Sequence, residues 1–79
     1  MEDFKNKFFA ILIEKFHVNS DELTTEKLFY ELGADSLDMV ELIIEFEKHF
    51  SITIPDEEAD KIITVGDAEK YLKSKLNIH

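Results

Sequence analysis

The sequence has no cysteine, a single proline and only two glycines among its 79 residues. Without cysteine the chain cannot form a disulfide, a thiolate metal site or a cysteine nucleophile, so any thiol chemistry requires an attached group. Glu2 and Asp3 stand where a secretory leader would carry basic residues, and no apolar run approaches the length that crosses a bilayer. We therefore expect a cytoplasmic protein without membrane insertion.

Basic residues are also scarce, with nine Lys and Arg against 18 Asp and Glu and a formal net charge of −9. Phosphate contacts require Lys and Arg, so this surface is a poor partner for nucleic acid and a good one for a basic protein surface. The length allows one small domain, residues 1–79, which we expect to be monomeric. The composition is 44% hydrophobic and includes seven Phe, which is enough for a core and argues against disorder.

The spacing of apolar residues predicts four helices. Apolar positions recur with helical period in residues 1–16 and 36–50, and shorter patterns follow in about 56–63 and from 65 onward. A long connection, residues 17–35, contains one short helical turn and is of the kind that is often functional. We therefore predict an all-α fold, a small four-helix bundle of three longer helices and one short helix, with a long first loop.

Residues that favour turns and caps stand at the expected boundaries. Gly33 marks a turn before the second helix, which either Asp35 or Ser36 can cap through its side-chain oxygen. Thr64 is predicted to cap the last helix, with Asp67 three residues later completing a capping box. These signals set the predicted starts of the second and last helices.

The segment between these two helices is harder to assign. Residues 51–54 alternate like a strand but have no evident pairing partner, so we read them as an extended link. Pro55 pre-sets the first turn of the short third helix. We expect the last helix to fray from about Lys73. The apolar residues predicted to face inward after the link are Ala59, Ile62 and Ile63.

The second helix carries two apolar stripes, at about 100° per residue. The first stripe contains Met39, Leu42, Ile43, Phe46 and Phe50, and the second contains Leu37, Val40 and Ile44. Ser36 and Glu47 lie between the stripes, and the remaining flank is acidic, with Asp38, Glu41 and Glu45. This arc is wider than a surface helix needs, so either all eight residues are core or one stripe stays exposed for a partner. We favour exposure of the second stripe, the one nearest Ser36.

The chain shows no active site of its own. Ser36 lacks the Gly-x-Ser-x-Gly context of a nucleophile elbow, and the scattered histidines His17, His49 and His79 make no ligand pair at helical spacing. We read each histidine as an exposed or boundary residue. The acidic clusters do not match a calcium loop; weak divalent binding stays open, with a solvated charged face as the simpler interpretation. We therefore predict neither a metal site nor an enzyme.

The chain resembles the acyl carrier proteins at their modification site, in Gly33-Ala34-Asp35-Ser36-Leu37-Asp38 followed by Val40-Glu41-Leu42. The likeness continues through Phe46-Glu47, Phe50, Ile54-Pro55-Asp56-Glu57-Glu58-Ala59 and Ile63-Thr64-Val65. An Asp-Ser-Leu match alone would be weak, whereas this match covers nearly the whole chain. The resemblance implies the same helical architecture and a covalent phosphopantetheine on Ser36, donated from coenzyme A by a phosphopantetheinyl transferase.

The resemblance also implies a function and a set of site residues. It implies a non-catalytic carrier that holds acyl groups as thioesters and docks the transferase and fatty acid synthesis enzymes through their basic surfaces. The partner-binding residues that the resemblance implies are Asp35, Leu37, Asp38, Val40, Glu41, Ile44 and Glu47. We add Glu45, because it lies on the same acidic flank of the second helix. We expect a long acyl chain to fold into the bundle, against a lining of Met39, Phe46, Ala59 and Ile62, although Phe46 could equally obstruct entry.

Two alternatives remain beside a carrier for bacterial fatty acid synthesis by separate enzymes. Carriers for polyketide, peptide or D-alanyl transfer share the serine motif. An acidic adaptor that docks basic partners without any modification belongs to a different class. The acidic second helix and the run from Ile54 to Glu58 favour the fatty acid pathway. Lys48 and His49 depart from the acyl carrier pattern, since many members of that family have acidic residues there. The negative surface is therefore smaller at the far end of the second helix.

Overall fold

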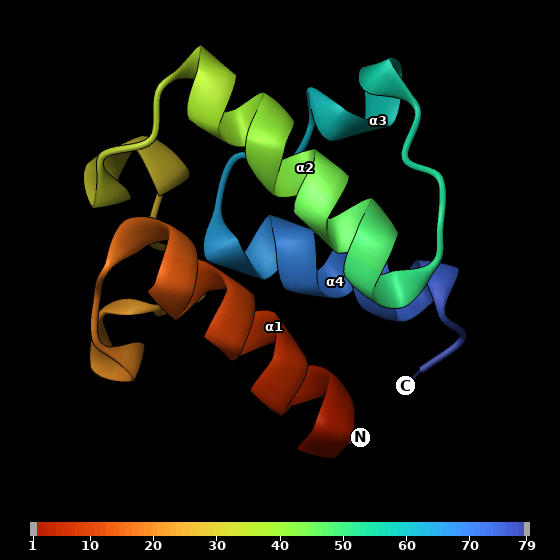
Figure 1. Cartoon of the computed structure of the whole chain (residues 1–79), viewed down its shortest axis with the longest axis horizontal. Helices are drawn as coiled ribbons and strands as arrows, with labels where there is room; N and C mark the ends of the chain where they lie inside the picture. Colours follow the sequence, from red (N-terminus) through yellow and green to blue (C-terminus); the bar gives the residue numbers. More distant parts are fainter. Residues whose placement is uncertain (1, 79) are drawn as a thin grey trace.

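The computed structural model describes residues 2–78 as four α-helices joined by loops that contain two 3-10 turns (Figure 1). Met1, the predicted first residue of the first helix, and His79 lie outside the described residues. The described range contains no β-strand, only an isolated bridge between Leu28 and Thr64. The all-α prediction of three longer helices and one short helix is therefore confirmed. The elements are α1 (Glu2–Phe16), η1 (Ser20–Glu22), η2 (Phe29–Leu32), α2 (Ser36–Phe50), α3 (Asp56–Ala59) and α4 (Val65–Lys75).

Aromatic packing joins α1 to α2. The rings of Phe8 and Phe46 are both fully buried and stack with their centroids 5.7 Å apart. The ring centroids of Phe4, near the start of α1, and Phe50, at the end of α2, are 5.4 Å apart. Because aromatic rings bury large areas and pair favourably at these distances, this cluster helps to fix the orientation of α2 against α1.

The long first loop is tied to the start of α4 by backbone hydrogen bonds. The amide of Phe29 donates to the carbonyl of Ile63 (3.0 Å), and the amide of Gly66 donates to the carbonyl of Thr25 (3.0 Å). A Cβ atom at Gly66 would lie only 2.8 Å from the Thr25 carbonyl oxygen, so this approach requires glycine. Gly33 follows η2 near the end of the loop, and its left-handed backbone (φ 95°) turns the chain toward α2 as predicted.

The predicted cap of the last helix is confirmed. The amide of Asp67 donates to the Thr64 hydroxyl (3.0 Å), and the amide of Thr64 donates back to the Asp67 carboxylate (3.1 Å). The amide of Ile63 donates to the same carboxylate (3.2 Å). The amides of Thr64 and Ile63 stabilise the ionised form of the Asp67 carboxyl, so they lower the pKa of Asp67 below its ordinary value.

One detail of the prediction, the inward placement of Ile63, is wrong. Ile63 is 53% exposed, whereas its neighbour Ile62 is buried. The reason is that α3 ends at Ala59, so these two residues lie in the connection to α4, outside any helix, and do not share one helical face. The last helix extends to Lys75, and Leu72, just before the point from which we expect fraying, is fully buried in the core.

Candidate functional site

The two apolar stripes of α2 have different environments. Leu42, Ile43 and Phe46 are buried, and Met39 and Phe50 are partly buried against the core. The second stripe is open to solvent, with Leu37 64%, Val40 56% and Ile44 47% exposed. The predicted exposure of the second stripe is thus confirmed, and the alternative that all eight residues are core is excluded. We call Leu37, Val40 and Ile44 the exposed stripe.

Ser36 is the first residue of α2, and its side chain is exposed. The cap is Asp35: the amide of Asp38 donates to the Asp35 carboxylate (2.9 Å), and the amide of Asp35 donates to the Asp38 carboxylate (3.1 Å). This settles which of the two predicted residues caps the helix. The first amides of a helix have no intrahelical acceptor and carry its positive dipole end, so Ser36 stands where a bound anion is favoured.

A groove of about 750 Å³ lies between α2 and α3, within the usual range of ligand pockets. Three of the four residues predicted to line an acyl-chain pocket are in its wall, namely Met39, Ala59 and Ile62. Phe46 departs from the prediction, since it is fully buried against Phe8 and does not line the groove. The remaining lining is Ser36, Val40, Ile43, Ile44, Glu47, Ile54, Asp56 and Asp60. We call this the α2–α3 groove.

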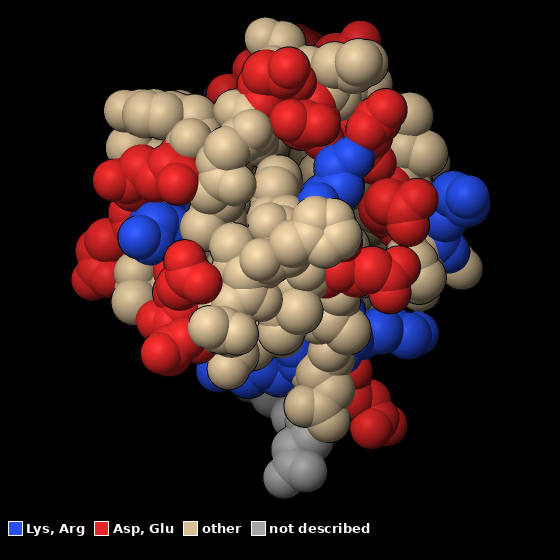
Figure 2. All heavy atoms as spheres, turned by 60° about the vertical axis from the view of Figure 1, so that its left-hand side comes forward, with Lys and Arg blue, Asp and Glu red and all other residues tan. Residues whose placement is uncertain are grey.

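The acidic residues of α2 border the exposed stripe, and several of them also have partners within the chain. Acidic side chains gather around a central area of uncharged residues on the face drawn in Figure 2, with basic side chains fewer among them. Glu45 contacts the His49 ring (3.2 Å), and Glu47 accepts the Ile54 amide (2.8 Å). The Glu47 bond fastens the extended link to α2, which the sequence pattern did not indicate.

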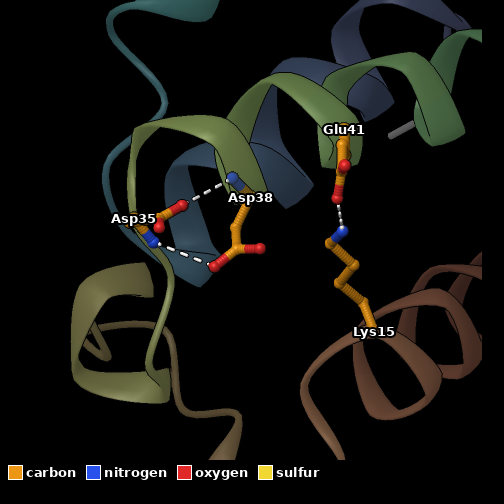
Figure 3. Close-up of polar contacts among 4 residues, drawn as sticks. All are labelled: Lys15, Asp35, Asp38 and Glu41. Atoms are coloured by element: carbon orange, nitrogen blue, oxygen red, sulfur yellow. Dashed lines mark hydrogen bonds and ion pairs between the residues drawn. The ribbon is translucent and has the colours of Figure 1, made fainter.

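Lys15 of α1 is the functional-site neighbour that sequence reasoning missed. Its Nζ lies 2.5 Å from a carboxylate oxygen of Glu41, across the space between α1 and α2 (Figure 3). The hydrogen bond to Glu41, helped by the nearby charges of Asp38 and Glu45, raises the pKa of Lys15 above its ordinary value. No local signal reveals this pair, because the two residues are 26 positions apart.

A second contact supports the α3 wall of the groove. The Tyr71 hydroxyl on α4 donates a short hydrogen bond to the Glu58 carboxylate on α3. Burial of the ring, together with that carboxylate, raises the pKa of Tyr71 to about 12. Glu58 and Tyr71 therefore hold α3 against α4 beside the groove.

Among the side chains that the structure describes, those of residues 3–78, there is no cluster of three or more suited to hold a metal ion. Nor does any helix in that part of the chain combine the length and apolar character needed to cross a membrane.

The comparisons with known proteins agree with this geometry. Residues 6–72 match the family described as the phosphopantetheine attachment site. A crystal structure of an acyl carrier protein from Thermotoga maritima is 36% identical in sequence, with a TM-score of 0.79, over 96% of this chain and 89% of that one. The chain therefore belongs to the phosphopantetheine attachment site family, as one of its acyl carrier proteins. It is a non-catalytic carrier whose covalent group is phosphopantetheine, as the sequence predicted.

Proposed function

We propose that Ser36 carries the phosphopantetheine and that the chain serves fatty acid synthesis by separate enzymes. The observation that supports this best is the position of Ser36. It is exposed at the start of α2, lines the α2–α3 groove and adjoins the exposed stripe. When bound, the group supplies the thiol that holds an acyl chain as a thioester, which a chain without cysteine cannot supply itself.

The residues around Ser36 suit this attachment. The free amides of the first turn and the positive end of the helix dipole favour the negative phosphodiester. The reciprocal bonds between Asp35 and Asp38 fix the geometry of that turn. Because Ser36 begins a helix whose opposite face is core, its side chain is presented outward to a transferase.

The α2–α3 groove is the proposed site for the acyl chain. Met39, Ala59 and Ile62 supply apolar walls, and Ile43 and Ile54 add to them. Each methylene removed from water contributes about 0.8 kcal/mol, so longer chains gain more from entering. Stability should therefore rise with the length of the bound chain, and melting temperatures of the loaded protein measure this. A melting temperature that is independent of chain length would argue against the groove.

The exposed stripe and its acidic border form the proposed docking surface. Apolar patches exposed on a small monomer mark interaction sites, and surrounding charge mainly sets encounter rate and specificity. The net charge of −9 favours partners with basic surfaces, which we propose are a phosphopantetheinyl transferase and the fatty acid synthesis enzymes. The residues proposed for docking are Asp35, Leu37, Asp38, Val40, Glu41, Ile44, Glu45 and Glu47.

The attachment residue is tested by a transferase reaction followed by intact mass measurement. The wild-type chain should gain the mass of one phosphopantetheine, and Ser36→Ala should gain none. Ser74→Ala is the matched control, because Ser74 is also an exposed helical serine but lies on α4, and this variant should be modified fully. A mass gain in Ser36→Ala would move the attachment to another residue.

The cargo separates the fatty acid pathway from other carriers. Polyketide, peptide and D-alanyl carriers use the same serine motif, whereas the acidic α2 and the run Ile54–Glu58 favour fatty acyl chains. The family match argues against an adaptor that is never modified. We also propose that the chain acts in the cytoplasm, as a monomer and as one domain. Mass spectrometry of the protein from its own cells would identify the attached acyl groups.

A further inference from the structure

The ion pair between Lys15 and Glu41 lies beside the proposed docking surface. Glu41 directly follows Val40 and precedes Ile44 by three residues, so it borders the exposed stripe. The Glu41 side chain is 52% exposed and within reach of a partner, while the Lys15 side chain is only 21% exposed. Figure 3 shows Lys15 reaching from α1 to the carboxylate. A partner that approaches Glu41 therefore meets a carboxylate that already has a cation.

The same two residues share a second groove. It lies between α1 and α2, has a volume of about 620 Å³, and includes Lys15, Glu41, Ile44 and Glu45 in its wall. Ile44 thus belongs both to the exposed stripe and to the wall in which the ion pair sits. A partner side chain cannot cover Ile44 fully without coming close to Lys15.

Glu41 differs in this respect from the other acidic residues proposed for docking. Asp35 and Asp38 accept backbone amides, Glu47 accepts the Ile54 amide, and Glu45 contacts a histidine that is charged only when protonated. Among residues 2–78, Glu41 is thus the one docking carboxylate neutralised by a lysine. The hydrogen bond to Glu41, together with the nearby charges of Asp38 and Glu45, also raises the pKa of Lys15 and so favours its charged form.

We propose that Lys15 competes with a partner's basic residue for Glu41 and so determines which partners can use this carboxylate. This rests on the proposed docking surface. A partner that needs Glu41 must displace an intramolecular ammonium, whereas a partner that makes no contact with Glu41 is unaffected. An arginine is better suited to the displacement than a lysine, because its fork can engage both carboxylate oxygens at once. Lys15 therefore acts as a specificity-determining residue and not as part of the attachment site.

The test is a double-mutant cycle of Lys15→Gln and Glu41→Gln, read out as the association rate with one purified phosphopantetheinyl transferase that modifies the wild-type chain. If Lys15 masks Glu41, Glu41→Gln should slow association more in the Lys15→Gln background than in the wild type. Lys15→Gln alone should speed association about two- to fivefold at low salt, the range that one exposed ion pair can produce, and less at high salt.

The control separates masking from overall charge. Lys70→Gln removes the same charge from α4, on a lysine with no ion pair among the described residues, and should change the rate less than Lys15→Gln. Equal effects of Glu41→Gln in both backgrounds, or slower association of Lys15→Gln, would overturn the proposal. Intact mass reports separately on the proposed function: modification that survives Ser36→Ala refutes that function whatever the cycle shows.

Discussion

The two faces of α2 are built from similar residue types but lie in opposite surroundings. Phe46 on the inner face is fully buried and stacks on Phe8 of α1, whereas Ile44, two residues earlier, is 47% exposed. The inner face holds the helix in place, and the outer face, beginning at Ser36, is left for partners. A domain of 79 residues can therefore carry a binding surface on a helix that is also central to its core.

The largest effect should come from the inner face. Phe46→Ala should lower the free energy of unfolding by about 3–5 kcal/mol, because it removes a fully buried ring and leaves a cavity. That loss is a large part of the stability of a small domain. Urea denaturation followed by circular dichroism measures it. A loss below about 1 kcal/mol would mean that this face is not the core that the structure shows.

Glu47 sharpens the comparison, because it was predicted as a docking residue but also has an internal role. Glu47→Ala removes the acceptor of the Ile54 amide and should cost about 1.5–3 kcal/mol, the usual range for a hydrogen bond to a charged group. Glu41→Ala is the matched control and should cost less than about 1 kcal/mol, because its ion pair is exposed. Similar losses in the two variants would show that the Ile54 bond contributes little.

Tyr71 tests the α3 wall of the groove through the pH dependence of stability. Its pKa is raised to about 12 in the folded chain, against an ordinary value of 10.0, so the folded state holds this proton more tightly. The contribution of the protonated Tyr71 hydroxyl to the free energy of unfolding is complete below pH 10.0 and is lost as the pH rises toward about 12. Tyr71→Phe should therefore lose less stability than the wild type over this interval. The same slope in both chains would mean that Tyr71 is not responsible.

The smallest effect on stability should come from the outer face. Ile44→Ala should change the free energy of unfolding by less than about 1 kcal/mol, since nearly half of the side chain is already in water. The same change should slow modification by the transferase, because an exposed apolar contact is lost. Thermal melts and modification kinetics on one preparation give both values. A stability loss equal to that of Phe46→Ala would place Ile44 in the core.

Features of the sequence that act locally predicted the structure well. Periodicity separated the two stripes of α2 because a helix presents a fixed angle per residue, and Gly33 and Thr64 marked boundaries through their backbone and capping chemistry. The exposed position of Ser36 at the start of α2 was predictable in the same way. The match of α2 to Ser36–Phe50 follows from these signals together.

Contacts between distant segments could not be predicted in this way. Phe46 fell on the correct face, but only the packing against Phe8 shows that it is sealed off from the α2–α3 groove. The ion pair of Lys15 with Glu41 depends on how α1 crosses α2, which no local pattern encodes. Ile63 was placed inward because the sequence pattern did not show that α3 ends as early as Ala59.

The most direct test of the central claim is to locate the phosphopantetheine on the protein isolated from its own cells. Tandem mass spectrometry of a proteolytic digest should find the group on the peptide that contains Ser36, bound to the Ser36 oxygen, with fatty acyl chains on a fraction of the molecules. A group on any other residue, or an unmodified Ser36 in protein taken from growing cells, would contradict the account.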